Sequence, residues 1–114
     1  MANSFKSETD KEIGTSTATV FTCASSTETT VIGLSVANRV SSQILIDVEL
    51  DASSRTSGAE DKVFLVKDAP IPVGGSLVVV GGDQKLVMEP GDTIKVTSDT
   101  ASSADVVLSH LDIT

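Results

Sequence analysis

The sequence has no tyrosine or tryptophan, and it has only three phenylalanines, one cysteine and one histidine. Because aromatic residues are so few, the hydrophobic core must be built from valine, isoleucine and leucine, which suit a pleated sheet better than a helix. A single cysteine, Cys23, excludes an internal disulfide. A nucleophilic Cys23 would need His110 as its base, and nothing in their spacing indicates that the two meet. We therefore expect Cys23 to be a buried, inert thiol and His110 to face solvent or another subunit.

Positive charge is also scarce, with 8 Lys and Arg against 16 Asp and Glu, a net charge of −8. This balance argues against nucleic acid and against an anionic membrane surface as partners, since both require clustered Lys and Arg. No apolar run is long enough for a transmembrane helix. Residues 1–14 lack the apolar segment of a secretory signal. We expect a protein that stays in the cytoplasm or assembles there into something larger.

The 114 residues suffice for one domain. Residues 71–96 are the most informative part of it, because apolar runs alternate there with glycine and proline turns. Strands are predicted at residues 77–80, 85–88 and 93–96, with turns at residues 72–75, 81–83 and 90–92. Further strands are predicted at residues 18–23, 29–38, 43–51, 61–68 and 104–113. The pattern predicts an all-β fold, a single antiparallel β-sandwich of about eight strands, jelly-roll or immunoglobulin-like, with a small closed barrel as the alternative.

Two strands show a clear alternation between faces. Their predicted core residues are Ile32, Leu34 and Val36 in one, and Ile44, Ile46, Val48 and Leu50 in the other. Residues 1–16 are polar and of mixed charge, so we expect a flexible, extended N-terminal arm that could order on a neighbouring subunit, followed by the sandwich domain over residues 17–114.

No catalytic, cofactor-binding or metal site is predicted. Carboxylates gather around one strand and the loop after it: Asp47, Glu49, Asp51, Glu60 and Asp61. Side chains two apart on a strand lie nearly 7 Å from each other, too far to share one calcium ion, so a solvated polar face is the better interpretation. Pro90-Gly91-Asp92 and Gly81-Gly82-Asp83 are interpreted as a turn before a strand and a hairpin turn, because no helix N-terminus follows that could bind phosphate.

The strands around Val78–Val80 and Phe64 present apolar side chains on both faces, so the strand around Phe64 is expected to be central or covered. A two-sheet sandwich buries only one face of each sheet, so the second apolar face needs a cover: a loop, the arm or another chain. This is the main indication from the residues of an obligate partner or a homo-oligomer.

Several segments also resemble a known group of proteins. They are VFTC at residues 20–23, TTVIGLSVAN at 29–38, IDVEL at 46–50, the run from FLVKD at 64 to VTSD at 99, and LDIT at 111–114. The resemblance is to small β-sandwich virion structural proteins of tailed bacteriophages, of the marine and cyanobacterial phage type. The matching motifs are Asn38 at a strand end, K-x-x-x-I-P-x-G from Lys67 to Gly74, and G-D-x-I-x-V from Gly91 to Val96.

The resemblance implies a many-copy virion protein without enzymatic activity, cofactor or metal, assembled in the host cytoplasm. A capsid decoration (cement) protein that binds the particle through sheet faces and the N-terminal arm is the favoured role, and a neck or tail-associated protein is the alternative. The implied partners are the major capsid protein or neck and tail proteins, within a homo-oligomer for which a trimer is favoured. A carbohydrate- or receptor-binding module is the alternative of another class, but the sequence lacks the aromatic residues that stack on sugars.

Overall fold

The computed structural model describes residues 3–55 and 61–114. In this part of the chain it has nine strands and no helix. The strands are β1 (Asn3–Ile13), β2 (Ala18–Thr22), β3 (Glu28–Asn38), β4 (Ile44–Asp51), β5 (Lys62–Ile71), β6 (Ser76–Val80), β7 (Leu86–Met88), β8 (Thr93–Ser98) and β9 (Ala104–Ile113). The predicted all-β sandwich is confirmed, and each of the predicted strands is present.

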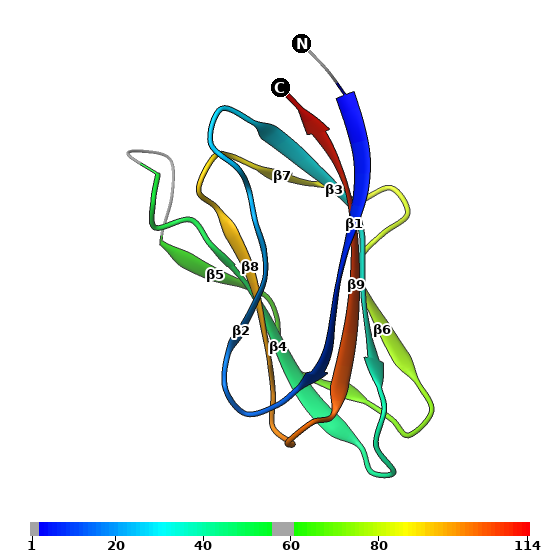
Figure 1. The fold of residues 1–114 in the computed structure, drawn as a ribbon. Coiled ribbons are helices and arrows are strands. Elements are labelled where there is room, and N and C mark those ends of the chain that lie inside the picture. The colour runs from blue at the N-terminus through cyan, green and yellow to red at the C-terminus, as the bar shows by residue number, and fades with distance from the viewer. Residues whose placement is uncertain (1–2, 56–60) are drawn as a thin grey trace.

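The strands form two antiparallel sheets that face each other (Figure 1). Sheet A has the order β1-β9-β3-β6, with β7 also paired to β3, and sheet B has the order β2-β8-β4-β5. The partners are nested: the first strand pairs with the last, the second with the last but one, and the innermost pair is β4 with β5. This nested pairing, divided between two sheets, is the jelly-roll alternative of the predicted sandwich.

The N-terminal segment is part of the sandwich. Strand β1 pairs with β9 from Asn3 opposite Ile113 to Asp10 opposite Val106 and again at Ile13 opposite Ala104, with an irregularity between Asp10 and Ile13. The prediction of a free arm over residues 1–16 is therefore wrong for residues 3–13, while residues 1 and 2 lie outside the described residues. The polar sequence of this segment does not indicate a strand, because β1 is an edge strand that is bound to the sheet mainly by backbone hydrogen bonds. Of the β1 side chains, only that of Ile13 is buried in the core.

The core lies between the sheets. The prediction for β4 is confirmed, because Ile44, Ile46, Val48 and Leu50 are all buried. The prediction for β3 is wrong at its first residue: Val31 is buried with Leu34 and Val36, whereas Ile32 is only half-buried. The cause is an irregularity between Val31 and Gly33 in the pairing with β9, where one extra residue reverses the alternation of faces.

Two other local predictions need correction. Gly81-Gly82-Asp83 does not form a hairpin turn, because β6 and β7 both pair antiparallel with β3 and so follow each other along the same edge. The glycines form a turn that interrupts this edge, with Gly82 at a φ of 63°. The strand around Phe64 was expected to be central or covered. It is β5, the edge of sheet B, and Phe64 is 52% exposed.

The turn at Pro90-Gly91-Asp92 is confirmed. The Asp92 N–H donates to the Glu89 carbonyl over 3.0 Å, and Gly91 has a φ of 90°, a conformation that glycine adopts without strain. A Cβ atom at Gly91 would also collide with Ser54. The carboxylate of Asp92 is fully buried and accepts hydrogen bonds from the Glu89 N–H and from Arg55. The aspartate thus fixes the turn to the loop that carries Arg55.

Candidate interaction surface

The outer face of sheet A is the candidate site, and the strand alternation defines it. On β9 the side chains of Val106, Leu108 and His110 point into the sandwich and are buried, so those of Val107, Ser109 and Leu111 point outward. Their partners on the neighbouring strands share that orientation. The side chains at the centre of this face, here called the neutral face, are Phe5, Ser7, Thr9, Thr30, Gly33, Ser35, Val78, Val87, Val107, Ser109 and Leu111.

The neutral face is organised in three rows that cross the strands. The two outer rows are Phe5, Leu111, Thr30 and Val87, and Thr9, Val107, Ser35 and Val78. The middle row consists of the small residues Ser7, Ser109 and Gly33. Four of the apolar side chains are open to solvent: Phe5 (76% exposed), Val78 (66%), Val87 (61%) and Val107 (48%). An apolar area of this kind is typical of an interaction site.

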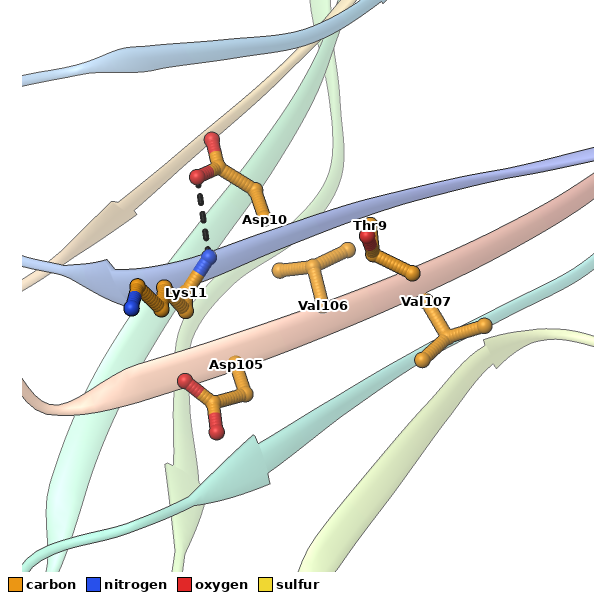
Figure 2. A pocket seen from close by; sticks show the side chains of 6 residues that line it. All are labelled: Thr9, Asp10, Lys11, Asp105, Val106 and Val107. Carbon is orange, nitrogen blue, oxygen red and sulfur yellow. Dashed lines mark hydrogen bonds between the residues drawn. The ribbon is translucent and has the colours of Figure 1, made fainter.

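None of the side chains in the three rows is charged, and charged side chains lie around them. Glu28 lies at one end, where it pairs with Ile113. At the other end Arg39 and Asp105 form an ion pair of 3.0 Å, and Lys11 lies beside them. Lys11 and Asp105 border an open depression that is also lined by Thr9 and Val107 (Figure 2). The absence of charge from the centre stands out in a chain with a net charge of −8.

The outer face of sheet B is different, because it carries the carboxylates of β4. Lys67 contacts Asp47 at 3.3 Å, and Lys95 contacts Asp51 at 2.9 Å. Hydrogen bonds from Ser53 and from Lys95 lower the pKa of Asp51 well below its ordinary range. Within residues 3–55 and 61–114, no group of three His, Cys, Asp or Glu side chains is arranged to hold a metal ion. Glu60 lies outside the described residues.

A polar network is buried at one end of the sandwich, and it includes His110. This side chain is 1% exposed, so the expectation that it faces solvent or another subunit is wrong. Its Nδ1 atom is 2.8 Å from Asp112 Oδ1, and its Nε2 atom is 2.9 Å from Glu8 Oε2. Both contacts are hydrogen bonds only when both ring nitrogens carry a proton. The Phe21 ring covers the imidazole, with 4.3 Å between the ring centroids.

The same network reaches Cys23 but does not activate it. The Thr29 hydroxyl donates to Asp112 Oδ1 over 2.8 Å and accepts from the Cys23 thiol over 3.3 Å. Burial raises the pKa of Cys23, which keeps the thiol protonated. Both nitrogens of His110 are occupied by carboxylates, so it does not serve the thiol as a base. Cys23 is 1% exposed, as expected for a buried thiol, and the network joins β1, β3 and β9.

Sequence reasoning found part of the neutral face and missed the rest. Val78 was recognised because three consecutive valines must present side chains to both faces. The rows themselves depend on which strands are neighbours, and no local signal contains that information. Glu8 was missed as a partner of His110 because its segment has no apolar alternation.

No helix of residues 3–55 and 61–114 is long and apolar enough to cross a membrane. The sequence matches no protein-family model and none of the curated proteins compared with it. Among solved structures, the fold is similar to that of a Bacillus endospore appendage, described as belonging to a novel family of disulfide-linked pili. The superposition has a TM-score of 0.55 at 9% identity and covers 99% of this chain and 87% of the other. At this identity the similarity shows the fold alone.

Proposed function

We propose that the protein is a structural subunit of a bacteriophage virion, present in many copies as a capsid decoration protein. The observation that carries the proposal is the presence of two separate apolar surfaces on one small domain. One is the neutral face of sheet A, and the other is the edge strand β5, where Val63 and Phe64 are 45% and 52% exposed on opposite sides of the strand. A subunit built into an assembly meets more than one neighbour, and each contact requires such a surface.

The remaining chemistry is consistent with a role that consists of binding. The buried histidine and cysteine are engaged in structural hydrogen bonds. The exposed phenylalanines Phe5 and Phe64 lie on different sheets, so they do not form one platform for a sugar ring. This disfavours the carbohydrate-binding alternative.

The Bacillus appendage gives limited support, because it is an assembly whose subunit shares this fold. Its family is described as disulfide-linked. The single cysteine here is buried, so the same linkage is not available through Cys23. The sequence resemblance to phage virion proteins therefore remains the reason for proposing a virion rather than a pilus.

Quantitative mass spectrometry of purified phage particles tests the proposal. Copies on the order of hundreds per particle support capsid decoration, whereas a dozen or so support a neck or tail position, since copy number follows the symmetry of the site. If the protein is made during infection but is absent from purified particles, the proposal fails.

A further inference from the structure

We infer that the neutral face is a homodimer interface, in which the same face of a second copy packs against it about a two-fold axis. The axis crosses the strands along the middle row of Ser7, Ser109 and Gly33. This inference specifies a partner for one surface of the proposed virion subunit, and in that sense it rests on the proposed function. The β5 edge remains free for other contacts.

The apolar rows are complementary under this rotation. A two-fold axis along the middle row keeps each strand opposite its own copy and exchanges the two outer rows. Leu111 of one copy then faces Val107 of the other, because the two lie equally far from Ser109 on β9. In the same way Val87 of one copy faces Val78 of the other, since both pair with β3 on opposite sides of the middle row. Apolar side chains therefore meet apolar side chains at these two pairs, while Phe5 faces Thr9 and Thr30 faces Ser35.

The charged ends of the two copies also meet under this rotation. The rotation brings the Glu28 end of one copy over the end of the other copy that carries Lys11 and the Arg39–Asp105 pair. Glu28 of one copy thus meets an end of mixed charge, where Lys11 and Arg39 lie with Asp105, Asp10 and Glu12. A two-fold axis parallel to the strands would instead place the two Glu28 ends together, and like charges disfavour that arrangement. Charge thus selects the axis that crosses the strands.

A second copy suits this face better than a charged partner does. The chain carries a net charge of −8, so two copies repel each other over most of their surface and least where the surface is uncharged. A basic partner would be attracted to the carboxylates on sheet B rather than to the neutral face. From strand spacings of about 4.8 Å and a rise of about 3.3 Å per residue, the face covers roughly 500 Å² per copy. The pair would bury on the order of 1,000 Å², which is the low end for specific interfaces and predicts a weak dimer.

Site-directed cross-linking tests the geometry. Val107→Cys and Leu111→Cys are made as separate variants, and each is treated with a short bis-maleimide, alone and as an equimolar mixture. Facing sheets lie about 10 Å apart, which a short reagent spans. We expect cross-linked dimers mainly in the mixture, because residue 107 of one copy faces residue 111 of the other, while the two 107 positions lie about 13 Å apart along the strand. Wild-type protein is the control, since Cys23 is buried.

Solution mass provides a second test, measured by light scattering and sedimentation up to high micromolar concentration. Val107→Asp is expected to weaken dimerisation at least tenfold, because two carboxylates would then be buried against apolar rows. Val63→Asp is the matched control. Val63 is 45% exposed and Val107 is 48% exposed, but Val63 lies on β5, outside the neutral face. The inference is overturned if the cross-link forms only between two 107 positions, or if both substitutions have equal effects on the mass. It is also overturned if the protein is a monomer at every concentration or a trimer. These results are independent of the particle analysis, since a dimer that is absent from virions would contradict only the proposed function.

Discussion

The two sheets of this sandwich share one core but have outer faces of opposite character. On sheet B the outer face carries Asp47, Glu49 and Lys95, and it holds the ion pairs Lys67–Asp47 and Lys95–Asp51. On sheet A the centre of the outer face has no charge, and four large apolar side chains are open to solvent. A sheet that needs only solubility can be covered by charge at little cost. The difference shows that the two outer faces of one sandwich can differ in charge, and it supports the outer face of sheet A as the place where we propose that a second copy binds.

The strongest test of this comparison uses two adjacent residues of β9. Val106 is 1% exposed and points into the core, whereas Val107 is 48% exposed and points outward. We expect Val106→Asp to destabilise the fold by about 4 kcal/mol or more, because it buries an unpaired carboxylate. Val107→Asp should change the free energy of unfolding of the monomer by less than about 1 kcal/mol. Urea denaturation at low protein concentration measures both, and equal effects would contradict the assigned orientation of β9.

The next largest effect is expected at the buried ion pair of Arg55 and Asp92. Replacing Arg55 with methionine leaves the fully buried Asp92 carboxylate with fewer partners, at a cost of about 3 kcal/mol. Lys67, which contacts Asp47 on the open face of sheet B, is the comparison. Its side chain is 54% exposed, and Lys67→Met should leave the urea midpoint unchanged within error. A large effect of Lys67→Met would mean that the charges of sheet B contribute more than solubility.

A smaller effect is expected with pH. Hydrogen bonds from Ser53 and Lys95 lower the pKa of Asp51. Burial opposes the shift at Asp112, but hydrogen bonds from Thr29 and His110 outweigh it and lower that pKa too. A carboxylate whose pKa is lower in the folded state stabilises the fold above its unfolded pKa, so stability is lost as the pH falls below about 4.

Asp51→Asn should therefore reduce the loss of stability in acid. Asp105→Asn, at the end of the neutral face, should reduce this loss less. Burial raises the pKa of Asp105, and the hydrogen bonds from the Glu12 N–H and Arg39 must first offset that effect before they lower the pKa. Thermal unfolding between pH 7 and pH 2 measures the difference. If the two variants respond equally to acid, sheet B has no special share in the acid sensitivity.

The sequence predicts most of the fold where the signal is local. The alternation of β4 and the turn at Pro90-Gly91-Asp92 depend on neighbouring residues, and both predictions are confirmed. Predictions failed where distant strands decide the outcome. The bulge near Ile32 arises from the pairing with β9, and the turn at Gly81-Gly82-Asp83 takes its role from β3.

The candidate site was predictable only in part for the same reason. The three valines at 78–80 indicate an excess of apolar surface, but the rows of the neutral face exist only once β1, β9, β3 and β6 lie side by side. His110 has an ordinary position in an alternating strand, and its burial depends on Glu8 and Asp112 as partners. Asp112 lies two residues away on the same strand, whereas Glu8 lies 102 residues away, so only the pairing with Glu8 has no counterpart in the local pattern.

The pairing of the first strand with the last also determines the order in which the molecule can fold. Asn3 pairs with Ile113, so β1 has no partner until nearly the whole chain is available, and closing so long a loop makes the step slow. During that time β1 is exposed to the other chains around it. The strand is kept soluble before it pairs, and is hindered from pairing with the edge of another chain, by its charged residues Lys6, Glu8, Asp10, Lys11 and Glu12. The polarity that makes β1 resemble a disordered tail thus protects a strand whose partner, β9, is the strand most distant from it in the sequence.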